Sequence, residues 1–529
     1  MQTALSSKYL ESLGYKLYRC PHCGSFYYGF SPKGCGEYPE KPYSFVGNPR
    51  IHDFSLRQLI DHYTKFFEEH DHTLVPRYPV IARWRDDLLL TIASIVCFQP
   101  WVTEGIVEPP ANPLVIHQPC LRFDDYRNVG YTARHSVAFT MSAHHAFNKY
   151  WKEEMLQLCI EFFQDLGFLP EEITFKLSMW EGGGNAGECY EVIISGLEVA
   201  TLVLMHYKED PQGTVELQGR RYSELPVKVI DTGYGAERIL WILTGKPTVF
   251  DAVYPELVKH LEQLFGVDKD EKEQYINQLL SGRVDRQAAK KLASMYRLLD
   301  FLRVICLLAH DGAVPSNKKD GYLLRLAIRQ AYSLLWKYTE KEDLKEEAKQ
   351  MFYWIKENID PAFDQRRLEY ILEVLEIEKE RFKKLVEQFR NFDFSRLKTP
   401  EDVAKLYETQ GLPIFYYEDR LPCEVDQVFE LLAGSKLTGG VKKIKQEKKL
   451  LPLPKELPPT QQEYYTDPYC TETRARILWV SENEKYVVLD RTIFYPEGGG
   501  QPADTGFINN RRVRRAFLQE GKIVHELED

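Results

Sequence analysis

Residues 115–150 read VIHQPCLRFDDYRNVGYTARHSVAFTMSAHHAFNKY, and this stretch indicates the fold. Its apolar runs, joined by a polar loop, predict two successive strands, with Arg122 on the first segment and Arg134 on the second. Two guanidinium groups aimed into one cleft can bind phosphate oxygens, because their planar fork suits these oxygens and stays charged. Phe139 can stack on a purine. The alternative interpretation is two solvated arginines and a core phenylalanine.

The sequence around this stretch follows the pattern of an α+β protein. Residues 112–240 contain further short apolar runs bounded by turn residues, and residues 149–167 form an amphipathic pattern typical of a helix. Residues 54–70 and 83–98 are also predicted to be helical. Runs of strands with flanking helices indicate an antiparallel sheet flanked by helices.

The remainder of the chain changes pattern twice. Residues 255–394 are predicted to be mostly helical, with the longest periodic segment at 369–389, and after residue 467 short strand patterns return. These patterns predict five segments: a cysteine-bearing segment (1–50), an α+β domain (51–254), a helical domain (255–434), a linker (435–463) and a small β-barrel-like domain (464–529).

Composition and charge exclude several classes of protein. With 44% hydrophobic and 28% charged residues, the chain has an ordinary globular composition, and its ten cysteines in 529 residues do not make a disulfide scaffold. The longest apolar run, residues 88–98, is too short to span a bilayer, and no signal peptide pattern opens the sequence. The net charge of −10 argues against a nonspecific nucleic-acid coat. We therefore expect a cytoplasmic protein that does not bind membranes.

Residues 229–240, VIDTGYGAERIL, form a second cluster with chemical meaning. A short strand meets Asp231, two glycines follow, and Arg238 lies at the predicted start of a helix. Glycines let a ligand approach the backbone, and a helix N-terminus already favours anions. Asp231 can hold an ammonium group; the alternative is that it caps the helix.

Residues 180–191, WEGGGNAGECYE, contain a formal G-x-G-x-x-G at Gly182, Gly184 and Gly187. A dinucleotide fingerprint requires a βαβ context, and the neighbouring pattern does not provide one. The sequence also lacks the G-x-x-x-x-G-K-[ST] motif of a P-loop ATPase.

Three stretches of the chain resemble the three signature motifs of class II aminoacyl-tRNA synthetases. They are residues 75–95, 118–141 and 231–239. Within that class NVGYTARH, WEGGGNAG and DTGYGAER are similar to the alanyl-tRNA synthetase family, and the cysteine-bearing start resembles its archaeal-type branch. AHDGAVPSNKKDGYLLRLAIRQA and LYETQGLP resemble the tRNA-recognition region of that family, and FYPEGGGQPADTG resembles the start of its editing region. The resemblance covers nearly the whole chain in order.

This resemblance implies that ATP and alanine form alanyl-adenylate, and that alanine is then transferred to the 3′ end of tRNA(Ala). Arg122 matches the arginine that binds the α-phosphate, Phe139 matches the residue that stacks on adenine, and Arg238 lies on the other side of the nucleotide. Arg134 is the further arginine expected at ATP. The implied catalytic residues are Arg122, Asp231 and Arg238.

The alanine pocket and its metal follow from the same resemblance. Asp231 and Gly233 match the residues that hold alanine, and Trp180 and Val203 match the pocket walls. Mg²⁺ is implied with ATP, with acidic residues such as Glu198 as candidate ligands. The family usually has a glutamate where Thr140 stands, so the sequence departs from the family at this position.

For tRNA, Asn317 matches the residue that reads a G·U pair in the acceptor stem. The second reader in the family is an aspartate, and Glu408 stands at that position, so the contact is either shifted or altered. Arg325 and Arg329 are expected to supply charge for the RNA backbone. The alternative for these residues is a solvated helix face.

Two features of the chain depart from the family. Cys20, Cys23 and Cys35 resemble a zinc knuckle, but structural zinc takes four ligands and the fourth cysteine of the family falls near Glu40; the segment either binds zinc or is a metal-free remnant. Only one of the 13 histidines follows residue 310, and no H-x-x-x-H occurs. We therefore expect the editing site and the C-terminal domain to be absent, so that the chain is a fragment or is completed by a second polypeptide.

Two other functions stay open at this stage. One is a non-catalytic tRNA-binding paralogue that keeps the fold, although a paralogue freed from catalysis would tend to lose Arg122, Asp231 and Arg238, and all three are present. The other is a class II ligase for a different small amino acid, which depends on the pocket around Trp180 and Val203.

Overall fold

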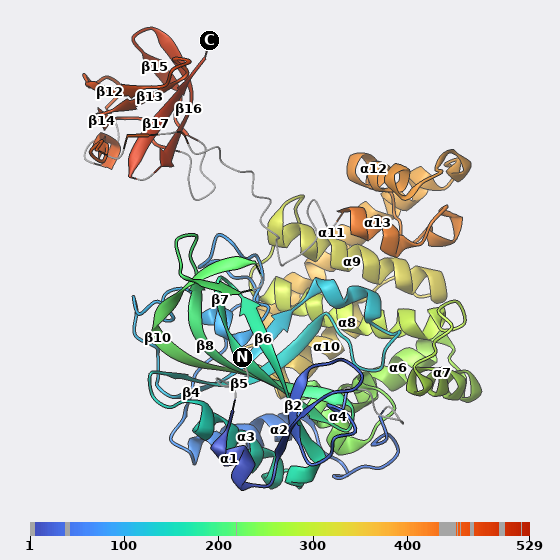
Figure 1. Cartoon of the computed structure of the whole chain (residues 1–529). Coiled ribbons are helices and arrows are strands. Elements are labelled where there is room, and N and C mark those ends of the chain that lie inside the picture. Colours follow the sequence, from blue (N-terminus) through green and yellow to red (C-terminus); the bar gives the residue numbers. More distant parts are fainter. Residues whose placement is uncertain are drawn as a thin grey trace. The chain divides into compact units, whose positions relative to one another are not determined.

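A computed structural model describes residues 6–37, 43–217, 219–432, 451, 453–454, 456–465, 470–496, 503–519 and 521–528. The chain divides into two compact units, residues 1–441 and residues 442–529, which are described separately (Figure 1). Most of the expected linker, the glycine run of the expected editing region and Glu40 lie outside the described residues.

A large sheet forms the centre of the first unit. Within the described residues it has ten strands: β1 (Lys16–Arg19), β2 (Phe26–Gly29), β3 (Thr73–Leu74), β4 (Leu114–Leu121), β5 (Ala138–Phe147), β6 (Ile173–Gly182), β7 (Asn185–Ile194), β8 (Leu197–Glu209), β9 (Val215–Leu217) and β10 (Arg220–Gly235). Their order is β1-β2-β6-β7-β8-β10-β5-β4-β3, with β9 beside β10. All pairs are antiparallel except β3 with β4. This mixed sheet with flanking helices confirms the predicted α+β class.

The cysteine-bearing start of the chain is part of this sheet. The β1–β2 hairpin joins it because Tyr27 and Tyr28 of β2 pair with Lys176 and Phe175 of β6. Helix α1 (Lys8–Ser12) is fastened to α3 (Lys152–Asp165), since the Ser7 hydroxyl donates to Glu153 at 2.6 Å.

The two faces of the sheet have different partners because side chains alternate along each strand. Helices α2 (Leu56–Glu68), α3 and α4 (Ala236–Thr244) cover one face, and Figure 1 shows α1, α2 and α3 grouped on that side. On β10, Tyr234 points to these helices and contacts the rings of Phe162 and Tyr63. Asp231 and Gly233, with the opposite parity, face the other side, where a cavity lies.

The remainder of the first unit is helical, as predicted. Its helices are α5 (Val249–Val253), α6 (Pro255–Phe265), α7 (Lys269–Ser281), α8 (Lys290–His310), α9 (Lys319–Tyr338), α10 (Lys345–Asn358), α11 (Gln365–Phe389), α12 (Pro400–Gln410) and α13 (Val425–Leu432). Helix α11 contains the segment with the longest predicted periodicity. Helix α8 is buried on nearly all sides and packs against α9, α10, α11 and β5.

The second unit contains a small curled sheet. Its five-stranded order is β12 (Ile477–Val480), β13 (Tyr486–Leu489), β17 (Lys522–Leu527), β16 (Arg511–Gln519) and β15 (Gly506–Ile508), and β11 (Gln461–Gln462) pairs with β14 (Arg491–Thr492). The predicted β domain is thus present. Strand β16 was not predicted, because four arginines between residues 511 and 515 obscure its apolar alternation; it is nevertheless held between β15 and β17.

The predicted helix at 83–98 is wrong. The segment contains only a 3₁₀ turn at Ser94–Cys97. Its backbone forms hydrogen bonds with neighbouring extended segments instead, since Thr91 N–H donates to Val80 at 2.9 Å and Leu121 N–H donates to Thr91 at 3.1 Å. Its apolar residues are buried by these neighbours, so a short apolar run looked like a helix face.

In the part of the chain that the structure describes, helices that combine the length and apolarity needed to cross a bilayer are absent.

Candidate functional site

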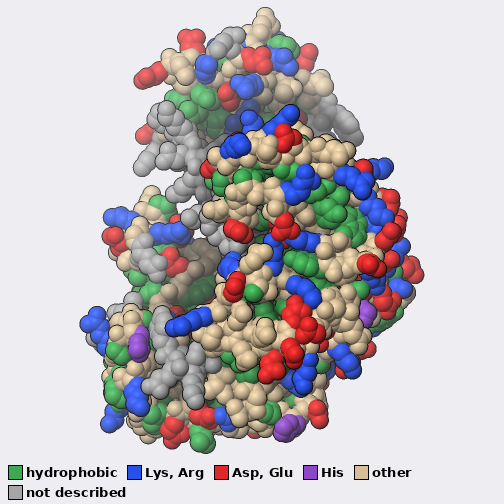
Figure 2. All heavy atoms as spheres, turned by 90° about the vertical axis from the view of Figure 1, so that its right-hand side faces the viewer, with side chains coloured by type: hydrophobic (Ala, Val, Ile, Leu, Met, Phe, Trp, Pro, Cys, Tyr) green, Lys and Arg blue, Asp and Glu red, His purple; other side chains and the backbone are tan. Residues whose placement is uncertain are grey.

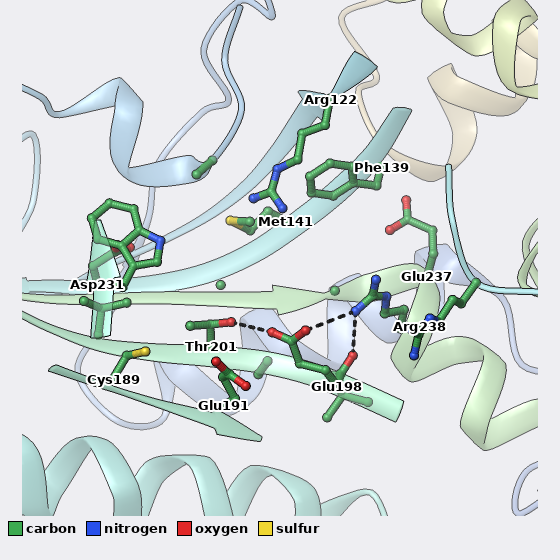
Figure 3. A pocket seen from close by; sticks show the side chains of 18 of the residues that line it. Arg122, Phe139, Met141, Cys189, Glu191, Glu198, Thr201, Asp231, Glu237 and Arg238 are labelled. Atoms are coloured by element: carbon green, nitrogen blue, oxygen red, sulfur yellow. Dashed lines mark hydrogen bonds and ion pairs between the residues drawn. The ribbon is translucent and has the colours of Figure 1, made fainter. Parts of the chain in front are cut away.

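A cavity of about 340 Å³ opens on the face of the sheet away from α2 and α3 (Figure 3). The residues predicted for ATP and alanine all line it: Arg122, Arg134, Phe139, Trp180, Val203, Asp231, Gly233 and Arg238. They come from positions up to 116 residues apart in the sequence, so the sheet brings together residues that belong to separate sequence motifs.

Strand register explains why these residues meet. On β10, Asp231 pairs with Val203 of β8 on one side and with His145 of β5 on the other. Gly233, two residues later, lies against Met141 of β5, because a Cβ at Gly233 would come within 2.8 Å of the Met141 sulfur. A glycine at this position therefore keeps the floor of the cavity open.

Arg122 and Phe139 form one wall of the cavity. Arg122 follows β4, and its Nε donates to the Ile92 carbonyl at 2.9 Å. Its guanidinium carbon lies 4.9 Å from the centre of the Phe139 ring. With Nε held by this hydrogen bond, the terminal guanidinium nitrogens of Arg122 point into the cavity (Figure 3). Such an arginine, held on an aromatic ring, is suited to bind phosphate oxygens.

Arg238 forms the opposite wall, at the start of α4 (Figure 3). Its Nη1 donates to the Glu198 carbonyl at 2.9 Å and lies 3.7 Å from the Glu198 carboxylate. The Thr201 hydroxyl donates to the same carboxylate at 2.9 Å. Glu198, the predicted magnesium candidate, is thus in the cavity and orients Arg238.

Asp231 lies at the end of the cavity away from Arg238 and Glu237 (Figure 3). Its side chain is buried, with 6% exposure, and burial raises the pKa of the carboxyl to about 7. The Nδ1 of His145 is 3.5 Å away, but burial lowers the pKa of His145 to about 3, so this ring is neutral at pH 7. The site therefore lacks a protein cation beside Asp231 among the described residues, and a bound cation would supply it.

Glu237 and Arg303 form a buried pair that sequence reasoning missed. One Glu237 oxygen accepts from Arg303 at 2.9 Å and from the Thr140 backbone at 2.8 Å. Arg303 also donates to the Thr140 hydroxyl at 2.6 Å and to the Tyr254 hydroxyl at 2.9 Å. Arg303 belongs to α8 in the helical region, so no local motif could link it to the cavity. The pair ties α8 to the strand and helix that carry Phe139 and Arg238.

The cavity also contains Cys189 and Glu191 of β7, which were not predicted. The Ser178 hydroxyl lies 2.8 Å from the Cys189 sulfur and donates to Glu191 at 2.7 Å. Lys176 lies 2.8 Å from Glu191 and 2.9 Å from Glu37. Burial raises the pKa of the Cys189 thiol to about 12, so it stays protonated. The formal G-x-G-x-x-G lies in the β6–β7 hairpin, which confirms that it is not a dinucleotide fingerprint.

A second hollow lies in the helical region, between α9, α11 and α12. It is lined by the four residues predicted for tRNA, namely Asn317, Arg325, Arg329 and Glu408. Asn317 comes from the loop before α9 and Glu408 from α12; the two helices are joined where the Tyr322 and Tyr407 hydroxyls meet at 2.8 Å. On the face drawn in Figure 2, basic and acidic side chains are interspersed.

The three predicted cysteines are also brought together. The sulfur atoms of Cys20, Cys23 and Cys35 all lie within 4.8 Å of one another, and Cys23 and Cys35 are 3.8 Å apart. Three sulfurs at 2.3 Å from one tetrahedral zinc would be about 3.8 Å apart, so the spacing fits three corners of a zinc site. The Glu37 carboxylate is 4.0 Å from the Cys35 sulfur.

Comparison with known proteins adds family information to this geometry. The family model described as tRNA synthetases class II (A) matches residues 58–281 and 275–528. The chain is 39% identical to an alanine–tRNA ligase of Methanopyrus kandleri, 37% identical to one of Caldivirga maquilingensis and 40% identical to one of Pyrobaculum neutrophilum. These matches cover 98–99% of the chain but only 61–63% of each relative.

Proposed function

The chain belongs to the class II (A) tRNA synthetases, and on that premise we propose that it activates alanine with ATP and transfers it to tRNA(Ala). The carrying observation is the composition of one cavity, which is lined by Arg122, Arg134 and Arg238 and holds the buried carboxyl of Asp231 at the end away from Arg238. That distribution of charge matches a nucleotide joined to an amino acid through the α-phosphate.

In the first step, an oxygen of the alanine carboxylate attacks the α-phosphorus of ATP. A new P–O bond forms, the bond to the β-phosphate oxygen breaks, and pyrophosphate leaves. Arg122 would hold the α-phosphate oxygens, where charge is redistributed during attack, and a preorganised cation gives its largest effect there. Phe139 and Arg238 would enclose adenine from opposite sides, and Arg134 would contact the phosphates.

Asp231 would bind the α-ammonium of alanine. Ionisation of this buried carboxyl is unfavourable until a cation arrives, so substrate and site each stabilise the charge of the other. Trp180, Val203 and Gly233 would bound the methyl group. A small pocket excludes larger amino acids by size, but one missing or added group is worth only about 1–3 kcal/mol, so glycine and serine would be rejected weakly.

Mg²⁺ fits the carboxylates that line the cavity. Mg²⁺ prefers oxygen ligands and usually binds one or two carboxylates together with substrate phosphates. Glu198 presents a carboxylate beside Arg238, and one oxygen of Glu237 is buried without a hydrogen-bond partner among the described residues. We assign these two residues as its protein contacts. When bound, Mg²⁺ would neutralise charge on the phosphates.

In the second step, a ribose hydroxyl at the 3′ end of tRNA attacks the carbonyl carbon of alanyl-adenylate. The ester C–O bond forms, AMP leaves and the hydroxyl loses its proton. Asn317 and Glu408 would read the acceptor-stem G·U pair from the second hollow. The longer side chain of Glu408 would make its contact about one methylene farther from α12 than an aspartate would.

Zinc is the metal that fits the N-terminal sulfur cluster. Cys20, Cys23 and Cys35 would supply three thiolate ligands, and zinc would fasten the β1–β2 hairpin to the segment around residue 35. Metal analysis of the purified chain tests this assignment, with one equivalent of zinc expected. A metal-free chain would support the alternative of a remnant knuckle.

The chain spans 61–63% of the length of the relatives it matches. We propose a second polypeptide that carries editing and C-terminal regions as a partner. The two other functions, a non-catalytic tRNA-binding paralogue and a ligase for another small amino acid, make different predictions in the same assay.

That assay is ATP–pyrophosphate exchange on the purified chain with alanine, glycine, serine or no amino acid. Exchange strongest with alanine supports the proposal, and exchange strongest with another amino acid favours the alternative ligase. A folded chain without exchange favours the paralogue. Asn317→Ala should lower tRNA charging and leave exchange unchanged; an equal loss in both steps would contradict its assigned role.

A further inference from the structure

The side chain of Asn317 has a fixed polarity in the second hollow. Its Oδ1 accepts a hydrogen bond from Nη1 of Arg325. A guanidinium group has only donors, so the atom of Asn317 that faces it must be the carbonyl oxygen rather than the amide nitrogen. The NH₂ group, on the other branch of the amide, is therefore directed away from Arg325.

Arg325 is itself held at three points. Its Nη2 donates to the Pro315 carbonyl at 3.1 Å, so the same side chain grips two residues of the loop before α9. Its Nε lies 3.3 Å from the carboxylate of Glu378 on α11, which is fully buried. Burying a charged carboxylate costs free energy unless cations pair with it, and this one also lies 3.5 Å from Arg329 and 2.7 Å from Arg381.

The loop that carries Asn317 is pressed against the first turn of α9. A Cβ at Gly321 would lie 2.1 Å from the Val314 carbonyl oxygen, so only glycine permits this approach. This close backbone contact fixes the position of the loop, and Arg325 orients the side chain of Asn317. A side chain that is fixed before binding loses little conformational entropy when it binds.

We propose that Arg325 and Glu378 are specificity-determining positioning residues, which set Asn317 as a hydrogen-bond donor to an acceptor on a base edge of an RNA duplex. The inference rests on the proposed tRNA function and deepens it. Arg325 acts through Asn317 rather than on phosphate, since its terminal nitrogens and its Nε already face protein partners and its side chain is only 16% exposed.

The neighbouring arginines have a different role in this proposal. Arg329 and Arg381 share the Glu378 carboxylate but are more exposed, at 25% and 56%, and Lys384 lies beside them around a shallow hollow. One buried carboxylate does not neutralise these cations. Their remaining charge suits the phosphates of an RNA backbone, which position a duplex without reading its sequence.

Asn317→Asp distinguishes the role of the amide NH₂ group from that of the amide oxygen. The aspartate keeps an oxygen for Arg325 and removes only the NH₂ donor. Two acceptor-stem hairpins that differ in one pair, G·U against G·C, are compared by fluorescence anisotropy and by kcat/KM for alanine transfer. We expect Asn317→Asp to lower the G·U preference as far as Asn317→Ala does.

Arg325→Lys tests the positioning role. Lysine keeps the charge but cannot hold Asn317, Pro315 and Glu378 together, so we expect the G·U preference to fall about tenfold, which corresponds to about 1.4 kcal/mol. Glu378→Gln should lower it in the same direction. Arg329→Lys is the matched variant, one turn along α9, and should weaken binding of both hairpins equally, with an unchanged ratio.

The outcomes separate the inference from the proposed function. Retained G·U preference in Asn317→Asp, or the same loss of preference in Arg329→Lys as in Arg325→Lys, would overturn the inference, as would a wild-type chain that binds both hairpins equally. Absence of alanine-dependent pyrophosphate exchange in the wild type would instead overturn the proposed function. The anisotropy ratios would still decide the role of Arg325, because they do not require activity.

Discussion

Asp231→Asn should strongly weaken alanine activation and at the same time stabilise the protein. The substitution keeps the shape of the side chain and removes the charge that would face the alanine ammonium. Asp231 is 6% exposed and its neighbour His145 is neutral at pH 7, so the protein has a buried carboxyl without a counter-charge at this point. The charge of Asp231 therefore favours alanine binding but lowers the stability of the fold.

The structure sets the size of both effects. Removing one partner of a buried ion pair costs about 3–5 kcal/mol, so kcat/KM for alanine should fall roughly 10²–10⁴-fold. For stability, the pKa is 3.8 in the unfolded chain and about 7 in the fold, so the native state keeps a proton that the unfolded state has lost. Stability contributed by the protonated group is thus lost as pH rises towards 7, up to about 4 kcal/mol.

The raised pKa of Asp231 predicts the pH dependence of two measurable quantities. Pyrophosphate exchange between pH 6 and pH 8.5 should show kcat/KM for alanine rising through about pH 7 in the wild type, as Asp231 ionises. Thermal unfolding should show Asp231→Asn more stable than the wild type at pH 8, by several degrees in Tm, with an advantage that shrinks towards pH 4. Asp270→Asn, an exposed position on α7, is the control and should change neither quantity.

The reasoning would be refuted by normal alanine activation in Asp231→Asn. A stability difference that is the same at pH 8 and at pH 4 would show that Asp231 is not a desolvated carboxyl. Loss of activity together with lower stability at every pH would mean that the carboxyl serves the fold rather than the substrate.

Three further changes test other parts of the molecule. Arg303→Met should lower the free energy of unfolding by about 3–5 kcal/mol in urea titrations, because it removes the arginine that pairs with the buried Glu237 carboxylate; an unchanged midpoint would contradict this. Gly233→Ala should push Met141 into the cavity and raise the KM for alanine about tenfold, measured by exchange, because the new Cβ would lie 2.8 Å from the Met141 sulfur; an unchanged KM would show that Met141 yields in another direction. Cys35→Ser should release bound zinc, measured by elemental analysis before and after dialysis, and full retention would remove Cys35 from the ligand set.

Much of the candidate site was predictable because its residues lie in recognisable local patterns. Arg122 follows a strand, Phe139 and Asp231 lie within strands and Arg238 lies in the first turn of a helix, and the structure brings all four to one cavity. Arg303 was not predictable, since it lies within an apolar helix where a single arginine has no local partner. Its importance is visible only when α8 is packed against β5 and α4.

The same contrast holds for the fold. The helices at α2, α3 and α11 follow from apolar residues at helical spacing, and this signal is local. The segment 83–98 carries a similar composition but forms extended contacts with Val80 and Leu121, which are close only in the folded chain. Strand β16 is missed for the opposite reason, because its arginines hide a strand that its two neighbours stabilise.

The sequence by itself determined the α+β class, the long amphipathic helices, the likeness to a class II synthetase and the residue types of the site, because each depends on neighbours along the chain. Only the tertiary structure decided the electrostatic environment and the hydrogen-bond partners of the site residues. Asp231 has a raised pKa because the sheet buries it beside a neutral histidine, and Asn317 has one amide orientation because Arg325 reaches it from α9. Desolvation and hydrogen-bond polarity arise from packing between distant segments, so residue spacing does not reveal them.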